Sequence, residues 1–364
     1  MTSPRQSVLA SRHKALGSEL GDWNDMDVPW EYKQDVNLEN FAVRKSAGLF
    51  DVSGIKKIHI TGPDAVAVAD HVCTRDITKL TPGQAILAII LNDEAEVVDD
   101  CMIFFISPNH LMLVHGGGIA MEQLEKSAEG KDVQIKFDDD LHIISLQGPL
   151  ALDFLNQYTS FELSELKDSN HRPATVFDRP CLISRTGYSN ERGYEIFAKG
   201  EDTTFIWDEI IKHGKDKGII PCSFNCIDMH RVEAGLYFFP YDMEEHDTPW
   251  DVNYGFAVDL DKQGEFRGKK NLLVAKGKET TALWSIILDI DEAVEFKDEL
   301  FDGDKKVGHI TAPCYSPIMK ASIALVRIDK EYAVPGKKLE LKGAYHNCSA
   351  TTGTMPLYDT KKNK

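Results

Sequence analysis

The sequence predicts an α+β protein in which two related halves are followed by a β-rich C-terminal part. The chain has 364 residues, enough for two or three closely packed domains. A strand, a Gly-Pro turn and a helix occur in succession around residues 56–72 and again around 141–155. This internal echo indicates a pair of α+β halves. After residue 280, strand-like runs are joined by Asp-Gly and Pro-Gly turns, which predicts a further β-rich region.

Composition narrows the possible functions. The chain has 41 Lys and Arg residues against 58 Asp and Glu residues, a net charge of −17, which argues against a nucleic-acid-binding surface. No apolar run approaches the length of a membrane span and residues 1–20 lack an apolar signal core, so we expect a cytoplasmic protein without membrane contact. The 7 cysteines are scattered and odd in number, which is typical of reduced thiols. Their spacing predicts no metal site.

The elements expected in the first half alternate between helix and strand. Helical spacing and strand-like runs predict, in chain order, a helix at 7–20, a helix at 38–47, a strand at 56–60, a helix at 64–72, strands at 86–91 and 97–105, a helix at 119–127 and a strand at 133–137. The stretch at 23–32 has no clear period. Its Trp23, Trp30 and Tyr32 lie beside several carboxylates, so it is either surface packing or a pocket that holds a cation by π contacts.

The second half repeats the pattern and ends in strands. We expect a strand at 141–147, a helix from Leu150, a hairpin at 182–198, helices at 203–214 and 225–235, and strands at 283–288, 307–312, 322–326 and 337–341. A charged stretch at 276–280 marks a boundary. We therefore place the domains at 1–276 and 277–364.

Three places carry charge inside apolar surroundings. In the strand at 97–105, alternation sends either Asp99 or Asp100 inward, where a carboxylate is paired, protonated or facing a ligand. In the hairpin, Glu195 lies between apolar neighbours and is either solvated on the outer face or directed inward toward paired N–H donors. On the helix at 225–235, Arg231 is buried by its spacing. It pairs with Glu233 or Glu195, or contributes to a binding site.

Several motifs in the same order resemble one known family. The segments concerned are Arg-Thr-Gly-Tyr and Gly-Tyr-Glu-Ile at 185–196, Ala-Gly-Leu-Phe-Asp-Val-Ser at 47–53, and Ile-Thr-Gly-Pro-Asp-Ala at 60–65. They are similar to those of the glycine-cleavage T-protein superfamily, the folate-dependent aminomethyltransferases and their demethylase relatives. The similarity spans nearly the whole chain. It implies a folate-binding fold of two related α+β halves, with the β-rich end forming a small C-terminal barrel.

The resemblance also implies roles for individual residues. Glu195 and Tyr188 match the family residues that hold tetrahydrofolate, the Glu by hydrogen bonds to the pterin ring. Arg231 matches an Arg of the folate site, and Arg185 stands in the same matching segment as Tyr188. One of Asp99 and Asp100 matches the acidic residue that faces the folate near N5 and N10. We favour Asp100, which alternates with apolar residues on the buried side.

Two departures from the family pattern concern the donor of the one-carbon unit. Leu87 stands where the family usually has a Tyr after Pro-Gly-Gln-Ala, and His115 stands where a strand usually ends in Val-Asn-Ala. His115 is a ligand contact, a base or a structural residue. Together with Trp23, Trp30 and Tyr32, it is our candidate for donor binding.

The resemblance leaves three hypotheses for function. The first is a tetrahydrofolate-dependent methyltransferase or demethylase that moves carbon from a small amine or sulfonium donor to N5 of tetrahydrofolate. The second is the glycine-cleavage aminomethyltransferase, which acts on a lipoyl carrier protein and releases ammonia. The third is a non-catalytic folate-binding assembly factor.

Overall fold

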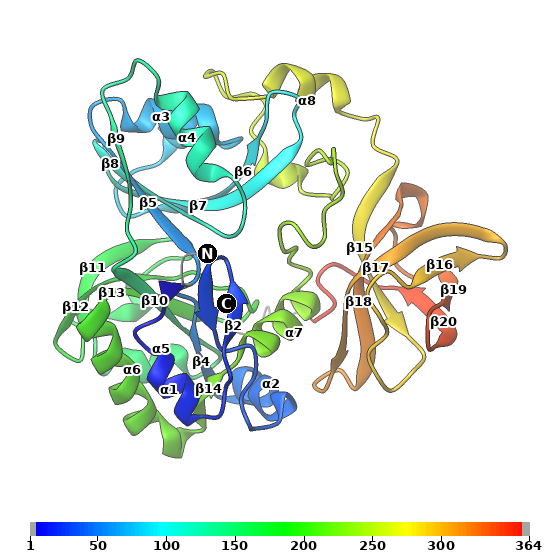
Figure 1. Cartoon of the computed structure of the whole chain (residues 1–364), viewed down its shortest axis with the longest axis horizontal. Helices are drawn as coiled ribbons and strands as arrows, with labels where there is room; N and C mark the ends of the chain where they lie inside the picture. Colours follow the sequence, from blue (N-terminus) through cyan, green and yellow to red (C-terminus); the bar gives the residue numbers. More distant parts are fainter. Residues whose placement is uncertain (1–4, 359–364) are drawn as a thin grey trace.

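The computed structural model describes residues 5–358 and confirms the predicted α+β class. Two mixed sheet-and-helix layers lie next to each other, and a β-barrel packs beside them with helix α7 (Phe224–Ala234) between the barrel and the sheets (Figure 1). No helix within this range is long and apolar enough to cross a membrane.

The first sheet has five strands with helices on its outer face (Figure 1). Apolar side chains of the strands pack against two helices to form one core. The strand order is β6 (Ala85–Leu91), β7 (Val97–Ser107), β8 (His110–His115), β5 (Lys56–Thr61) and β9 (Gln134–Phe137), and the helices are α3 (Ala65–Val72) and α4 (Ala120–Ala128).

The second sheet has six strands and a separate core against its own helices. The strand order is β11 (His171–Val176), β12 (Arg179–Ser184), β13 (Gly193–Lys199), β10 (Leu141–Gln147), β4 (Ala47–Asp51) and β14 (Ile219–Cys222). The helices of this half are α1 (Ala10–Ala15), α2 (Val36–Lys45), α5 (Ala151–Leu155) and α6 (Gly200–Gly214). The inner faces of the two sheets meet through a further apolar cluster, in which the rings of Phe104 and Phe197 are 5.2 Å apart.

The C-terminal strands close into the barrel that the resemblance implied. A short helix, α8 (Lys269–Ala275), precedes it. Around the barrel the order is β15 (Thr281–Leu288), β18 (Ala321–Asp329), β17 (Lys305–Ser316), β16 (Glu299–Asp302), β19 (Lys338–Lys342) and β20 (Asn347–Thr352).

The N-terminal part differs from its prediction. The expected helix at 7–20 is reduced to α1, because Gly17 adopts a φ of +90° and ends it. The aperiodic stretch after it forms a hairpin of β2 (Gly21–Trp23) and β3 (Met26–Val28), with β1 (Arg5–Gln6) alongside β3. Its turn residues Asn24 and Asp25 have φ values of 59° and 62°, the geometry of a two-residue hairpin turn.

A buried polar network holds this N-terminal segment on the second half. His13 Nε2 lies 2.9 Å from Asp51 Oδ2, and the Tyr32 hydroxyl lies 2.9 Å from His13 Nδ1. Burial would raise the pKa of Asp51, but the hydrogen bond and charge of His13 outweigh it and lower the pKa to about 2. Tyr32 therefore has a structural contact in place of the donor contact that we predicted.

This network predicts a pH dependence of stability. Because the folded-state pKa of Asp51 is below its ordinary 3.8, its contribution of about 2 kcal/mol is present above pH 4 and is lost as the pH falls toward 2. We expect the difference in unfolding free energy between wild type and Asp51→Asn to shrink as the pH falls from 6 to 3. Urea unfolding at each pH measures it, with exposed Asp216→Asn as control. A difference that is constant with pH would contradict the assignment.

Candidate active site

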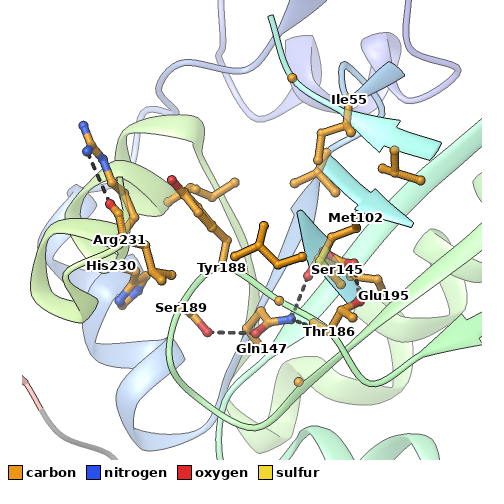
Figure 2. A pocket seen from close by; sticks show the side chains of 18 of the residues that line it. Ile55, Met102, Ser145, Gln147, Thr186, Tyr188, Ser189, Glu195, His230 and Arg231 are labelled. Carbon is orange, nitrogen blue, oxygen red and sulfur yellow. Dashed lines mark hydrogen bonds between the residues drawn. The ribbon is translucent and has the colours of Figure 1, made fainter. Parts of the chain in front are cut away.

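A cavity of about 440 Å³ lies where the two sheets meet helix α7 and the segment that follows it. Strands β4, β7, β8, β10 and β13 and the loop before β13 contribute its walls. Figure 2 shows part of this lining, with Glu195 and Gln147 on one side and Arg231 on the other. Because one wall comes from each sheet, neither half builds the cavity alone.

Glu195 points into this cavity from β13. It lies opposite Ser145 and Ser184 on the neighbouring strands, so the polar side of β13 faces small hydroxyl side chains. The hydroxyl of Thr186 donates to Glu195 Oε2, and among residues 5–358 no Lys, Arg or His forms an ion pair with this carboxylate. Burial raises the pKa of Glu195, and the Thr186 bond partly offsets that effect. The inward orientation, which alternation left open, is the one in the structure.

Gln147 is a cavity residue that sequence reasoning missed. Its amide nitrogen donates to Ser145 Oγ at 2.8 Å and to the Thr186 carbonyl at 3.2 Å, and Ser189 Oγ donates to its amide oxygen at 2.8 Å (Figure 2). A Cβ at Gly187 or Gly193 would lie within 2.4 Å of Gln147 atoms. Gly187 and Gly193 therefore leave the room that the Gln147 side chain occupies. These two motif glycines were the sequence signal from which a nearby side chain could have been inferred.

Asp100 lines the cavity from the opposite sheet. Burial, and after it the charge of Asp99, raises the pKa of Asp100 to about 7. Asp99 is fully buried and is not part of the cavity wall. Its Oδ2 lies 2.7 Å from His115 Nδ1 and accepts a 3.1 Å hydrogen bond from the backbone of Ala120 at the start of α4. The two neighbouring carboxylates therefore face opposite sides of the sheet.

Arg231 and Tyr188 are held on the α7 side of the cavity. Arg231 Nε donates to Asp228 Oδ1 at 2.7 Å and its Nη1 donates to Asp242. The predicted pairing with Glu233 or Glu195 is wrong, because the chain turns back after α7 and brings Asp242 to the Arg. The hydroxyl of Tyr188 donates to the Tyr237 carbonyl, so this side chain is fixed before any ligand binds.

The remaining predicted residues fall into two groups. Arg185, Trp23 and His115 line the cavity, and Arg185 also donates to the Leu166 carbonyl at 3.3 Å. Trp30 is not among the lining residues; its ring packs against Phe224 with centroids 4.8 Å apart. The cation pocket of three aromatic residues is therefore not formed.

The chain matches two family models that together cover most of its length. The GCVT N-terminal domain model matches residues 9–262, and the glycine cleavage T-protein C-terminal barrel domain model matches residues 282–359. The chain belongs to the glycine cleavage T-protein family. Leu87 and His115, the two residues that we expected to depart from the T-protein pattern, both line the cavity.

The chain is similar to two kinds of protein, an N-demethylase subunit and aminomethyltransferases. The chain is 42% identical to the heme-dependent oxidative N-demethylase gamma subunit of Ectopseudomonas mendocina, over 99% of this chain and 97% of the relative. It is 30% identical to an aminomethyltransferase of Bacillus pumilus, over 98% and 100%. The T-protein fold is also that of the glycine cleavage system aminomethyltransferase T from Bartonella henselae, with a TM-score of 0.90, 24% identity and full coverage of both chains.

Proposed function

We propose that the protein is a tetrahydrofolate-dependent one-carbon transferase whose carbon comes from a small methylated amine. The observation that carries this proposal is Glu195, a half-buried carboxylate on the cavity wall that forms no ion pair with a cation among the described residues. An uncompensated buried carboxylate is costly unless a ligand supplies N–H donors. The amino group and ring N–H of a pterin are such a pair of donors.

The cavity residues fit the rest of such a ligand. Tyr188 and Arg231 stand on the far side from Glu195, and Asp100 lies on the adjoining sheet. When bound, tetrahydrofolate supplies a nucleophilic nitrogen, N5, to the one-carbon unit. The chain's own residues orient that nitrogen and exclude water from it, and the Asp100 carboxyl holds or releases a proton beside it.

The proton balance of the transfer indicates the role of Asp100. Each exchange of a carbon–amine bond for a carbon–folate bond would require one proton to reach the departing amine and one to leave the folate nitrogen. A single carboxyl that gives a proton and regains it completes this exchange. With a pKa of about 7, Asp100 exists in both protonation states near neutral pH.

The relatives favour an amine as donor. The 42% identity is to a subunit of an oxidative N-demethylase, whereas the aminomethyltransferase match is 30% identical. We therefore propose that the carbon is an N-methyl carbon and that a haem-containing partner carries out its oxidation. An aminomethyltransferase acting on a lipoyl carrier protein is the second candidate, since full-length relatives bear that name. A non-catalytic folate-binding assembly factor would bind folate without turnover.

Calorimetric titration with tetrahydrofolate tests the proposal. We expect wild type to bind, and Glu195→Ala to lose at least about 2–3 kcal/mol of binding free energy because the pterin N–H groups lose a charged acceptor. Glu162→Ala, at an exposed site, serves as control. Absence of binding to wild type would rule out the folate site.

The donor is then identified by NMR. ¹³C-labelled N-methyl amines, or an aminomethyl-loaded lipoyl carrier, are mixed with protein and tetrahydrofolate, and the folate is examined for label. The amines are tested with and without a haem-containing oxidase. Label from the carrier alone would favour the aminomethyltransferase, and label from neither would favour the assembly factor.

A further inference from the structure

A buried Asp–His pair lies directly behind the cavity carboxyl Asp100. Asp99 precedes Asp100 on β7 but points to the opposite face, where its Oδ2 is 2.7 Å from His115 Nδ1. Asp99 is 0% exposed and His115 is 3% exposed.

Three hydrogen bonds hold the Asp99 carboxyl in place. Oδ2 also accepts from the Ala120 N–H at the N-terminus of α4, and Oδ1 accepts from the Asp100 N–H at 2.9 Å. The positive end of a helix and three hydrogen bonds all favour a carboxylate. A Cβ at Gly118 would lie 2.4 Å from Asp99 Cγ, so Gly118 leaves the room that this arrangement needs.

His115 does not neutralise that charge. Its Nε2 is buried and has no hydrogen-bond partner among the described residues. An imidazolium would bury a charged N–H without an acceptor, whereas a neutral ring with its proton on Nδ1 donates to Asp99 and leaves only a lone pair unsatisfied. The neutral tautomer is therefore the one that fits.

The other groups around Asp100 add no positive charge. Tyr188 comes from the loop before β13, Tyr237 and Tyr254 come from the segment after α7, and Cys101 follows on β7; burial, with the charges of neighbours that include Asp100, raises the pKa of each. The charge of Arg231 acts to lower the pKa of Tyr188 and Tyr254, but its ion pairs are with Asp228 and Asp242. Asp99 is thus the fixed charge behind Asp100.

We infer that Asp99 and His115 form a positioning pair that keeps a negative charge behind Asp100, so that Asp100 retains its proton near neutral pH and serves as the acid that protonates the departing amine. The catalytic part of this inference rests on the proposed function. The proton-holding part concerns the free protein and is tested without folate.

Infrared difference spectroscopy follows the carboxyl of Asp100 directly. The C=O stretching band of protonated Asp100 is the band that disappears in Asp100→Asn. Its intensity is followed in the full-length protein as the pH is varied. We expect its midpoint to fall by about one pH unit in Asp99→Asn, because the charge behind it is removed. The same midpoint in Asp99→Asn as in wild type would overturn the inference.

Two His115 variants keep the test decisive if Asp99→Asn does not fold. His115→Leu removes the ring that holds the Asp99 carboxyl in place, so the Asp100 midpoint should differ from that of wild type. His115→Gln keeps an N–H donor and should restore it. An unchanged midpoint in a folded His115→Leu protein would also overturn the inference. Failure of wild type to bind tetrahydrofolate would instead remove the proposed function and leave this titration standing.

Discussion

Asp100→Asn should lower the rate of one-carbon transfer about 10²–10⁴-fold while tetrahydrofolate still binds. Asn has nearly the same shape but cannot give or regain a proton, and loss of a positioned acid or base costs a factor of this size. Asp100 and Glu195 belong to different sheets, so the contacts expected between Glu195 and the pterin should remain. The rate is measured by single-turnover transfer of ¹³C from the donor that the NMR screen identifies.

A matched control for this substitution lies in the turn before the same strand. Glu94 is an exposed carboxylate between β6 and β7, and Glu94→Gln should leave the rate unchanged. A folded Asp100→Asn protein with a normal transfer rate would show that the proton comes from elsewhere. Parallel loss of folate affinity would show that Asp100 acts in binding and not in transfer.

The second large effect concerns stability. Arg44 of α2 is fully buried at its side chain, where Nη1 donates to Glu191 at 2.9 Å and Nε donates to Glu233 at 3.0 Å. Arg44→Leu would remove the Arg44 ion pair from both buried carboxylates. We expect a loss of about 3–5 kcal/mol in unfolding free energy, measured by urea unfolding.

A surface pair provides the comparison. Arg12 and Asp208 are 2.8 Å apart, but their side chains are 37% and 48% exposed. Arg12→Leu should therefore cost less than about 1 kcal/mol. Equal effects of the Arg12 and Arg44 substitutions would mean that the buried network adds no more than a solvated ion pair.

The α+β class and most of the long strands followed from local patterns of hydrophobic period and turn residues, but β4, β11 and β14 were not predicted. β4 is buried along its whole length, so it shows no alternation. The sequence predicted the positions of the charged side chains less well. Alternation shows that one of Asp99 and Asp100 faces inward, but neither is fully exposed here: Asp99 is buried under α4, and Asp100 is half-buried at the cavity. A sheet covered on both faces offers two interiors, and one-dimensional periodicity does not distinguish between them.

Contacts between distant segments account for the other differences. Trp30 and Tyr32 stand in an aromatic and acidic stretch typical of a pocket, yet the hairpin turn at Asn24 directs them to Phe224 and His13. Asp242, one of the two ion-pair partners of Arg231, comes after the chain has turned back, so spacing along the helix did not predict it. Gln147 was not predicted as a cavity residue because its place depends on Gly187 and Gly193, which lie far from it along the chain.

The contacts of Tyr358 bear on how the enzyme is made. Its backbone N–H donates to the Glu233 carbonyl at 2.9 Å, its carbonyl accepts from Asn190 at 3.1 Å, and its ring lies 4.5 Å from the Arg44 guanidinium carbon. Asn190 belongs to the loop that lines the cavity. Synthesis is vectorial, so a ribosome makes both sheets and the barrel before it adds the residue that fastens this loop. The binding site therefore reaches its final form only after translation has passed Tyr358.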